Sequence, residues 1–88
     1  MEETRVAQLG ILVEDPDSVE ALNALLHQYE DYIIGRMGLP YREKQVNIIS
    51  IVLDAPQDAI STLAGKVGML PGVSCKALYA KQIGRAHV

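Results

Sequence analysis

The chain has 88 residues, of which 49% are hydrophobic and 22% are charged, and its formal net charge is −3. This length suffices for one domain with a thin core, which association with another chain would stabilise. A chain with a net negative charge and no cluster of Lys and Arg is not expected to bind the phosphate backbone of nucleic acid by itself. No apolar stretch is long enough to span a bilayer. The acidic N-terminus is unlike a secretory signal, and a single cysteine, Cys75, fits a reducing compartment. We therefore expect a cytoplasmic protein that binds neither nucleic acid nor membrane.

Residues 4–14 are predicted to form a strand, because apolar residues recur at every second position along this segment. Asp15 and Pro16 then mark the start of a helix, with Asp15 as the N-cap and Pro16 in the first helical position. Apolar residues at helical spacing predict that this helix continues to Tyr29.

Residues 31–39 are predicted to form a second strand, which Gly35 and Gly38 interrupt. A turn over residues 40–44 leads into a third strand over residues 45–54. The chain therefore predicts a hairpin in its middle.

A second helix is predicted to begin at Pro56 and to end at Gly68, and a last strand covers residues 73–80. An internal repeat supports this order, because a shift of 40 positions places residues 11–16 on residues 51–56. A duplicated βαβ unit with right-handed crossovers predicts an α+β, ferredoxin-like βαββαβ fold, in which a four-stranded antiparallel sheet carries two helices on one face.

The C-terminal segment differs from the rest of the chain. Residues 83–88 match, letter for letter, the translation of a common short-read sequencing adapter. We therefore expect one domain over residues 1–81 and a non-native tail over residues 82–88, and no functional argument rests on Arg85 or His87.

The sequence offers few groups for chemistry. Before the tail, the chain has one histidine, His27, and one cysteine, Cys75, and they lie far apart, whereas transition-metal sites need three or four ligands in close spacing. No serine is accompanied by a histidine placed to act as its base. We therefore expect no metal, no cofactor and no catalytic residue.

Two segments are candidates for binding a small effector: the first strand–helix junction and the glycine-containing second strand. Their candidate residues are Glu14, Asp15, Asp17, Ser18, Gly35 and Arg36. At the junction, carboxylates are also typical of helix capping. In the strand, a glycine indicates either a locally weakened strand or a place where a ligand or a second subunit approaches the backbone closely.

Four segments of the chain closely resemble a small bacterial family of regulators of the iron-only hydrogenase system, and the resemblance covers about residues 4–81. These segments are residues 13–16, 32–41, 53–56 and 70–74. The resemblance implies an ACT-like fold, related to the C-terminal domain of the nickel-responsive repressor. The chain departs from amino-acid-binding ACT domains at Asp17, where they carry a glycine, and it lacks the repressor's histidine set and DNA-binding arm. If it regulates transcription, it is therefore expected to act through a partner.

The leading hypothesis is a non-catalytic, oligomeric regulatory module that senses a small effector at a subunit interface. The alternative is a scaffold or assembly partner of hydrogenase maturation proteins that has no small-molecule ligand. The face of the sheet opposite the helices is expected to form the subunit interface, since alternation leaves it mostly apolar. The interface residues are Val6, Gly10, Leu12, Val46, Ile48 and Val52. A homodimer is expected, or a tetramer if sheet edges also pair.

Overall fold

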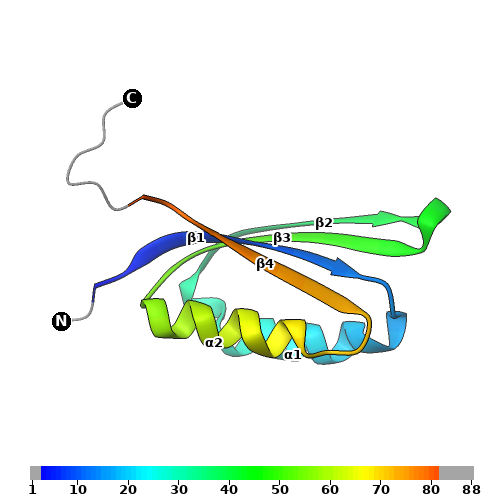
Figure 1. The fold of residues 1–88 in the computed structure, drawn as a ribbon, viewed down its shortest axis with the longest axis horizontal. Coiled ribbons are helices and arrows are strands. Elements are labelled where there is room, and N and C mark those ends of the chain that lie inside the picture. Colours follow the sequence, from blue (N-terminus) through cyan, green and yellow to red (C-terminus); the bar gives the residue numbers. More distant parts are fainter. Residues whose placement is uncertain (1–2, 82–88) are drawn as a thin grey trace.

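The computed structural model describes residues 3–81, which form four strands and two helices (Figure 1). In chain order the main elements are β1 (Arg5–Val13), α1 (Val19–Gln28), β2 (Ile33–Tyr41), β3 (Val46–Ala55), α2 (Gln57–Gly68) and β4 (Val73–Tyr79). Three short 3-10 turns are η1 (Pro16–Ser18), η2 (Glu30–Tyr32) and η3 (Arg42–Lys44). The predicted tail over residues 82–88 lies outside the described residues.

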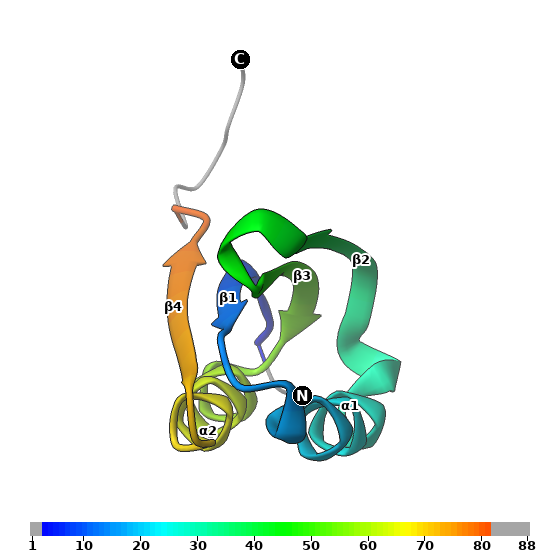
Figure 2. The same cartoon turned by 90° about the vertical axis from the view of Figure 1, so that its right-hand side faces the viewer.

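The four strands form one antiparallel sheet in the order β2-β3-β1-β4. Both helices lie against one face of this sheet, and no element of residues 3–81 covers the other face (Figure 1, Figure 2). The predicted α+β, ferredoxin-like βαββαβ architecture is therefore confirmed.

The hydrophobic core lies between the sheet and the two helices. Its most deeply buried side chains come from alternate residues of β1 and β3 and from one stripe on each helix: Leu9, Ile11, Ile51, Leu53, Leu22, Leu26, Ile60, Leu63 and Val67. Full burial of each such aliphatic side chain contributes about 1.5–3 kcal/mol. The alternation that builds this core leaves the other residues of β1 and β3 on the uncovered face.

The start of the first helical segment follows the predicted cap. Asp15 is extended, and its carboxylate accepts a hydrogen bond from the backbone N–H of Asp17 at 2.9 Å. The turn η1 comes first, and α1 continues from Val19 to Gln28. The cap therefore satisfies one of the free amides at the start of the segment.

The hairpin between β2 and β3 differs from its prediction. Strand β2 begins two residues later than predicted and continues to Tyr41, with Pro40 opposite Asn47. Proline is tolerated here because β2 is an edge strand, which has no partner on one side. Gln45 adopts a left-handed conformation with φ of 55° and closes the hairpin, so it does not belong to β3.

Candidate functional site

The first strand–helix junction is held by the turn that precedes β4. The Ser18 hydroxyl donates a hydrogen bond to the Pro71 carbonyl at 2.6 Å, and the backbone N–H of Glu14 donates to the Gly72 carbonyl at 2.7 Å. Ser18 is only 5% exposed. Two of the candidate side chains are therefore already hydrogen-bonded within the domain. The Asp15 carboxylate caps the first helical segment, and the Ser18 hydroxyl bonds the turn before β4.

A cavity of about 360 Å³, which we call the hairpin notch, lies between this junction and the β2–β3 hairpin. Its lining residues come from the end of β1, from η1 and from both arms of the hairpin: Val13, Glu14, Pro16, Pro40, Tyr41, Arg42, Gln45, Val46 and Asn47. The sheet register explains this meeting, because Val13 lies opposite Asn47 at the end of β1. Among these lining residues, Glu14 was predicted as an effector contact and Val46 as an interface residue, whereas the other hairpin residues were not predicted from the sequence.

The lining of the hairpin notch combines apolar side chains with two opposite charges. Within residues 3–81 the only ion pair joins His27 to Glu30 at 3.2 Å, so neither Glu14 nor Arg42 is neutralised by a neighbour there. The Tyr41 hydroxyl donates a hydrogen bond to the Glu43 carboxylate at 2.7 Å. This bond holds the proton on the phenol and raises the pKa of Tyr41.

The other two candidate residues, Gly35 and Arg36, lie away from the hairpin notch. Arg36 lies opposite Ile51, which in turn lies opposite Leu9. That position is four residues before the end of β1, or about 13 Å along the strand. The Arg36 guanidinium donates a hydrogen bond to the Asn23 side chain of α1 at 2.8 Å and lines a smaller cavity of about 280 Å³. The six candidate residues therefore do not form one site.

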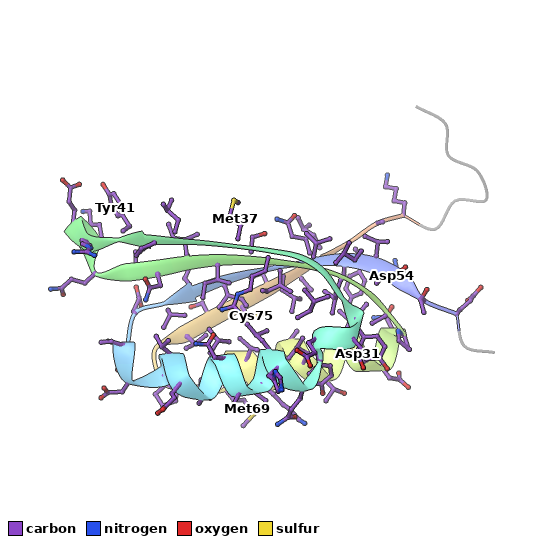
Figure 3. All side chains as sticks on the ribbon, turned by 180° about the vertical axis from the view of Figure 1, so that it is seen from behind. Asp31, Met37, Tyr41, Asp54, Met69 and Cys75 are labelled. Carbon is purple, nitrogen blue, oxygen red and sulfur yellow. The ribbon has the colours of Figure 1, made fainter. Side chains whose placement is uncertain are left out.

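The uncovered side of the sheet, which we call the free face, carries large exposed apolar side chains. Of the residues predicted there, Val6, Leu12 and Ile48 are 43%, 45% and 38% exposed, and Val46 and Val52 are half-buried. The other predicted member, Gly10, lies near the centre of the face, opposite Ser50. Two strands that the prediction omitted extend the patch, because β2 adds Met37 and Leu39 and β4 adds Leu78. Figure 3 shows Met37 on the side of the sheet away from the helices.

Cys75 lies on β4 between the sheet and the helices and is half-buried (Figure 3). Burial raises the pKa of its thiol above the ordinary value of 9.0. Because the thiolate is the reacting form, iodoacetamide at neutral pH is expected to alkylate Cys75 more slowly in the folded protein than in urea. The raised pKa has no effect on the free energy of unfolding at lower pH, and it lowers that free energy as the pH rises above 9.0. Equal alkylation rates in the two states would contradict this expectation.

Within residues 3–81, no group of three or more His, Cys, Asp or Glu side chains lies close enough together to hold a metal ion. No helix in this part of the chain is long and apolar enough to cross a membrane.

Comparisons with known proteins place this fold and sequence in a defined group. The model of the family TM1266-like, described as "Iron-only hydrogenase system regulator, putative", matches residues 5–77. Among solved structures, the uncharacterized protein TM1266 from Thermotoga maritima is 36% identical and superposes with a TM-score of 0.86. That match covers 90% of this chain and 100% of the Thermotoga chain. No curated protein matches the chain.

Proposed function

The chain belongs to the TM1266-like family, whose description is that of a regulator of the iron-only hydrogenase system, and we propose that it is a cytoplasmic, non-catalytic, oligomeric regulatory module that senses a small effector. The observation that carries this proposal is the hairpin notch. It is a preformed concave site with an apolar lining and two charges, on Glu14 and Arg42, that have no ion-pair partner within residues 3–81.

The chemistry of the hairpin notch suits a small ligand. Ligand sites are usually concave, mostly apolar cavities of about 300–1,000 Å³ with a few polar groups that fix orientation. The notch, at about 360 Å³, lies at the small end of that range. The amides of Gln45 and Asn47 each offer a donor and an acceptor, and the charges of Glu14 and Arg42 allow the site to orient a polar or charged ligand.

A thermal-shift screen tests this proposal. The probes are a panel of free amino acids, nucleotides and small carboxylic acids. A compound present at about 100 times its Kd stabilises the folded state by about 2.7 kcal/mol. For a domain of this size that gain corresponds to a rise in Tm of roughly 11–22 °C. We expect at least one compound of the panel to give a saturable rise.

The substitution Arg42→Ala is expected to weaken the binding of an anionic compound about 10–100-fold, because it removes a charge-assisted hydrogen bond. Lys44→Ala is the matched control, since Lys44 is an exposed cation of the same turn η3 that does not line the notch. Equal loss in both variants would contradict a site in the notch. If no compound shifts Tm and a hydrogenase maturation protein co-purifies with the chain, the scaffold function replaces the sensing function.

A further inference from the structure

A bulge in the edge strand β2 places Arg36 on the same side of the sheet as Ile33. Ile33 lies opposite Leu53. The next paired residue of β2 is Gly35, which lies opposite Val52, so β2 advances two residues where β3 advances one. Without the extra residue, strand alternation would place Ile33 and Arg36 on opposite faces. With it, both side chains face the helix layer, and α1 runs along the same edge of the molecule as β2 (Figure 2). Bulges are frequent at sheet edges and next to active sites, where they redirect a side chain.

The redirected arginine lines the cavity of about 280 Å³ between α1 and β2, which we call the edge crevice. Four of its residues recur at helical spacing along α1 and η2, and the other two come from β2: Asn23, Leu26, His27, Glu30, Ile33 and Arg36. Leu26 and Ile33 give the crevice an apolar part, and the other four side chains are polar. The edge crevice shares no lining residue with the hairpin notch.

Most hydrogen-bond donors of Arg36 are free to meet a ligand. Within residues 3–81 its guanidinium makes one hydrogen bond, to the side-chain oxygen of Asn23 at 2.8 Å, and no ion pair. A guanidinium only donates hydrogen bonds, so Asn23 must present its oxygen to Arg36 and keeps its own NH2 group as a further donor. Asn23 therefore holds the positive charge of Arg36 at the crevice without neutralising it.

The one carboxylate that lines the edge crevice has a partner on its own element. The Nδ1 atom of His27 lies 3.2 Å from the Oε1 atom of Glu30, which leaves the imidazole Nε2 atom for a ligand. The two side chains are 77% and 60% exposed, so their pairing contributes little to stability and can rearrange around a bound molecule. Arg36 is thus the lining cation that has no carboxylate partner within residues 3–81.

We propose that the edge crevice binds the oxyanion group of a small molecule, a phosphate or a carboxylate, through Arg36, with Asn23 and His27 as further donors. The planar fork of a guanidinium matches two oxygens of either group. Asn23 and His27 lie on α1, so an anion held by Arg36 is contacted from both walls of the crevice, and His27 donates when its imidazole is protonated. Leu26 and Ile33 meet an apolar part of the same molecule. This site is separate from the hairpin notch and does not depend on the proposed sensing function.

A titration of the full chain with sodium phosphate or sodium acetate, followed by 1H–15N NMR at pH 7 and constant ionic strength, tests the site. We expect saturable shifts of the backbone amides of Arg36 and Asn23. Arg36→Gln should weaken binding about 10–100-fold, because it removes charge-assisted hydrogen bonds. Lys66→Gln is the matched control, since it removes an exposed positive charge in the last turn of α2 that does not line the crevice. It should change the Kd less than about twofold.

The two anions distinguish the source of the oxyanion. Tighter binding of phosphate assigns the crevice to a phosphate group, tighter binding of acetate assigns it to a carboxylate, and equal binding shows that it accepts either. If neither anion gives saturable shifts, or if Arg36→Gln and Lys66→Gln weaken binding equally, the crevice is not an oxyanion site.

Arg42→Gln separates the edge crevice from the hairpin notch. An anion that loses affinity in Arg42→Gln and not in Arg36→Gln binds in the notch, which overturns the crevice site and leaves the sensing function standing. An anion that loses affinity in Arg36→Gln and not in Arg42→Gln supports the crevice site, whether or not the notch binds an effector.

Discussion

Replacing Gly72 with alanine is expected to lower the free energy of unfolding by about 2–5 kcal/mol. Gly72 has a φ of +68°, a conformation that residues with a Cβ adopt at a cost of roughly 1–2 kcal/mol. A Cβ at this position would also lie 2.6 Å from the Asp15 Cβ and 3.0 Å from the Asp15 backbone nitrogen. No real Cβ tolerates such contacts, so the turn or the junction must move.

Neither side of this contact can move freely. The Gly72 carbonyl accepts a hydrogen bond from the Glu14 N–H, and the neighbouring Pro71 carbonyl accepts one from Ser18. Moving the turn away from Asp15 would leave the buried Ser18 hydroxyl without its partner.

A second glycine in the same chain provides the control for Gly72→Ala. Gly65 lies inside α2, and a Cβ added there would meet nothing within 4 Å. Gly65→Ala is therefore expected to stabilise the protein by about 0.5–1 kcal/mol, because alanine favours the helix. Urea denaturation of the two variants at the same protein concentration makes the comparison. A change of less than about 0.5 kcal/mol for Gly72→Ala would show that the turn adapts, contrary to this account.

The elements of this fold could be predicted from local patterns in the sequence. Alternation along residues 4–14 predicted a strand, and β1 covers Arg5–Val13 with alternate residues such as Leu9 and Ile11 fully buried. The Asp15-Pro16 pair marked the start of the first helical segment, where the predicted cap is present. Periodicity and capping are determined by residues within one or two turns of each other, so a single sequence contains all that these predictions need.

The boundaries of β2 and the composition of the candidate site could not be predicted in the same way. Pro40 is compatible with β2 only because that strand lies at the sheet edge, and strand order is a property of the whole fold. The bond from Ser18 to Pro71 joins residues 53 positions apart, which local periodicity does not relate. The hairpin notch depends on the register that places Val13 opposite Asn47. The predicted βαββαβ topology pairs the first and third strands antiparallel, and this pairing is the feature of the sequence that places the hairpin beside the junction.

Replacing Ile51 with alanine is expected to lower the free energy of unfolding by about 2–5 kcal/mol. Ile51 is fully buried at the centre of β3, between Leu9 of β1 and the Arg36 position of β2, and its side chain faces the helices. The fully buried core between the helices and the sheet consists of aliphatic side chains, and the chain contains neither Trp nor Phe that could fill the space left by the truncation. The truncation therefore combines the loss of buried apolar surface with the cost of a cavity.

A graded series at Ile51 separates the loss of packing from other effects. Ile51→Val should cost about 0.5–1.5 kcal/mol, and Ile51→Ala should lower Tm by roughly 8–40 °C in a domain of this size. Ile34→Ala is the matched control, because Ile34 is 63% exposed beside the bulge of the edge strand β2 and should change stability by no more than about 0.5 kcal/mol. Thermal denaturation of all three variants at one protein concentration keeps any contribution from dimerisation constant. Since domains of this size are only marginally stable, the Ile51→Ala loss is a large part of the total. If Ile51→Ala and Ile34→Ala melted at the same temperature, the core between β3 and the helices would not be the structure that holds this domain together.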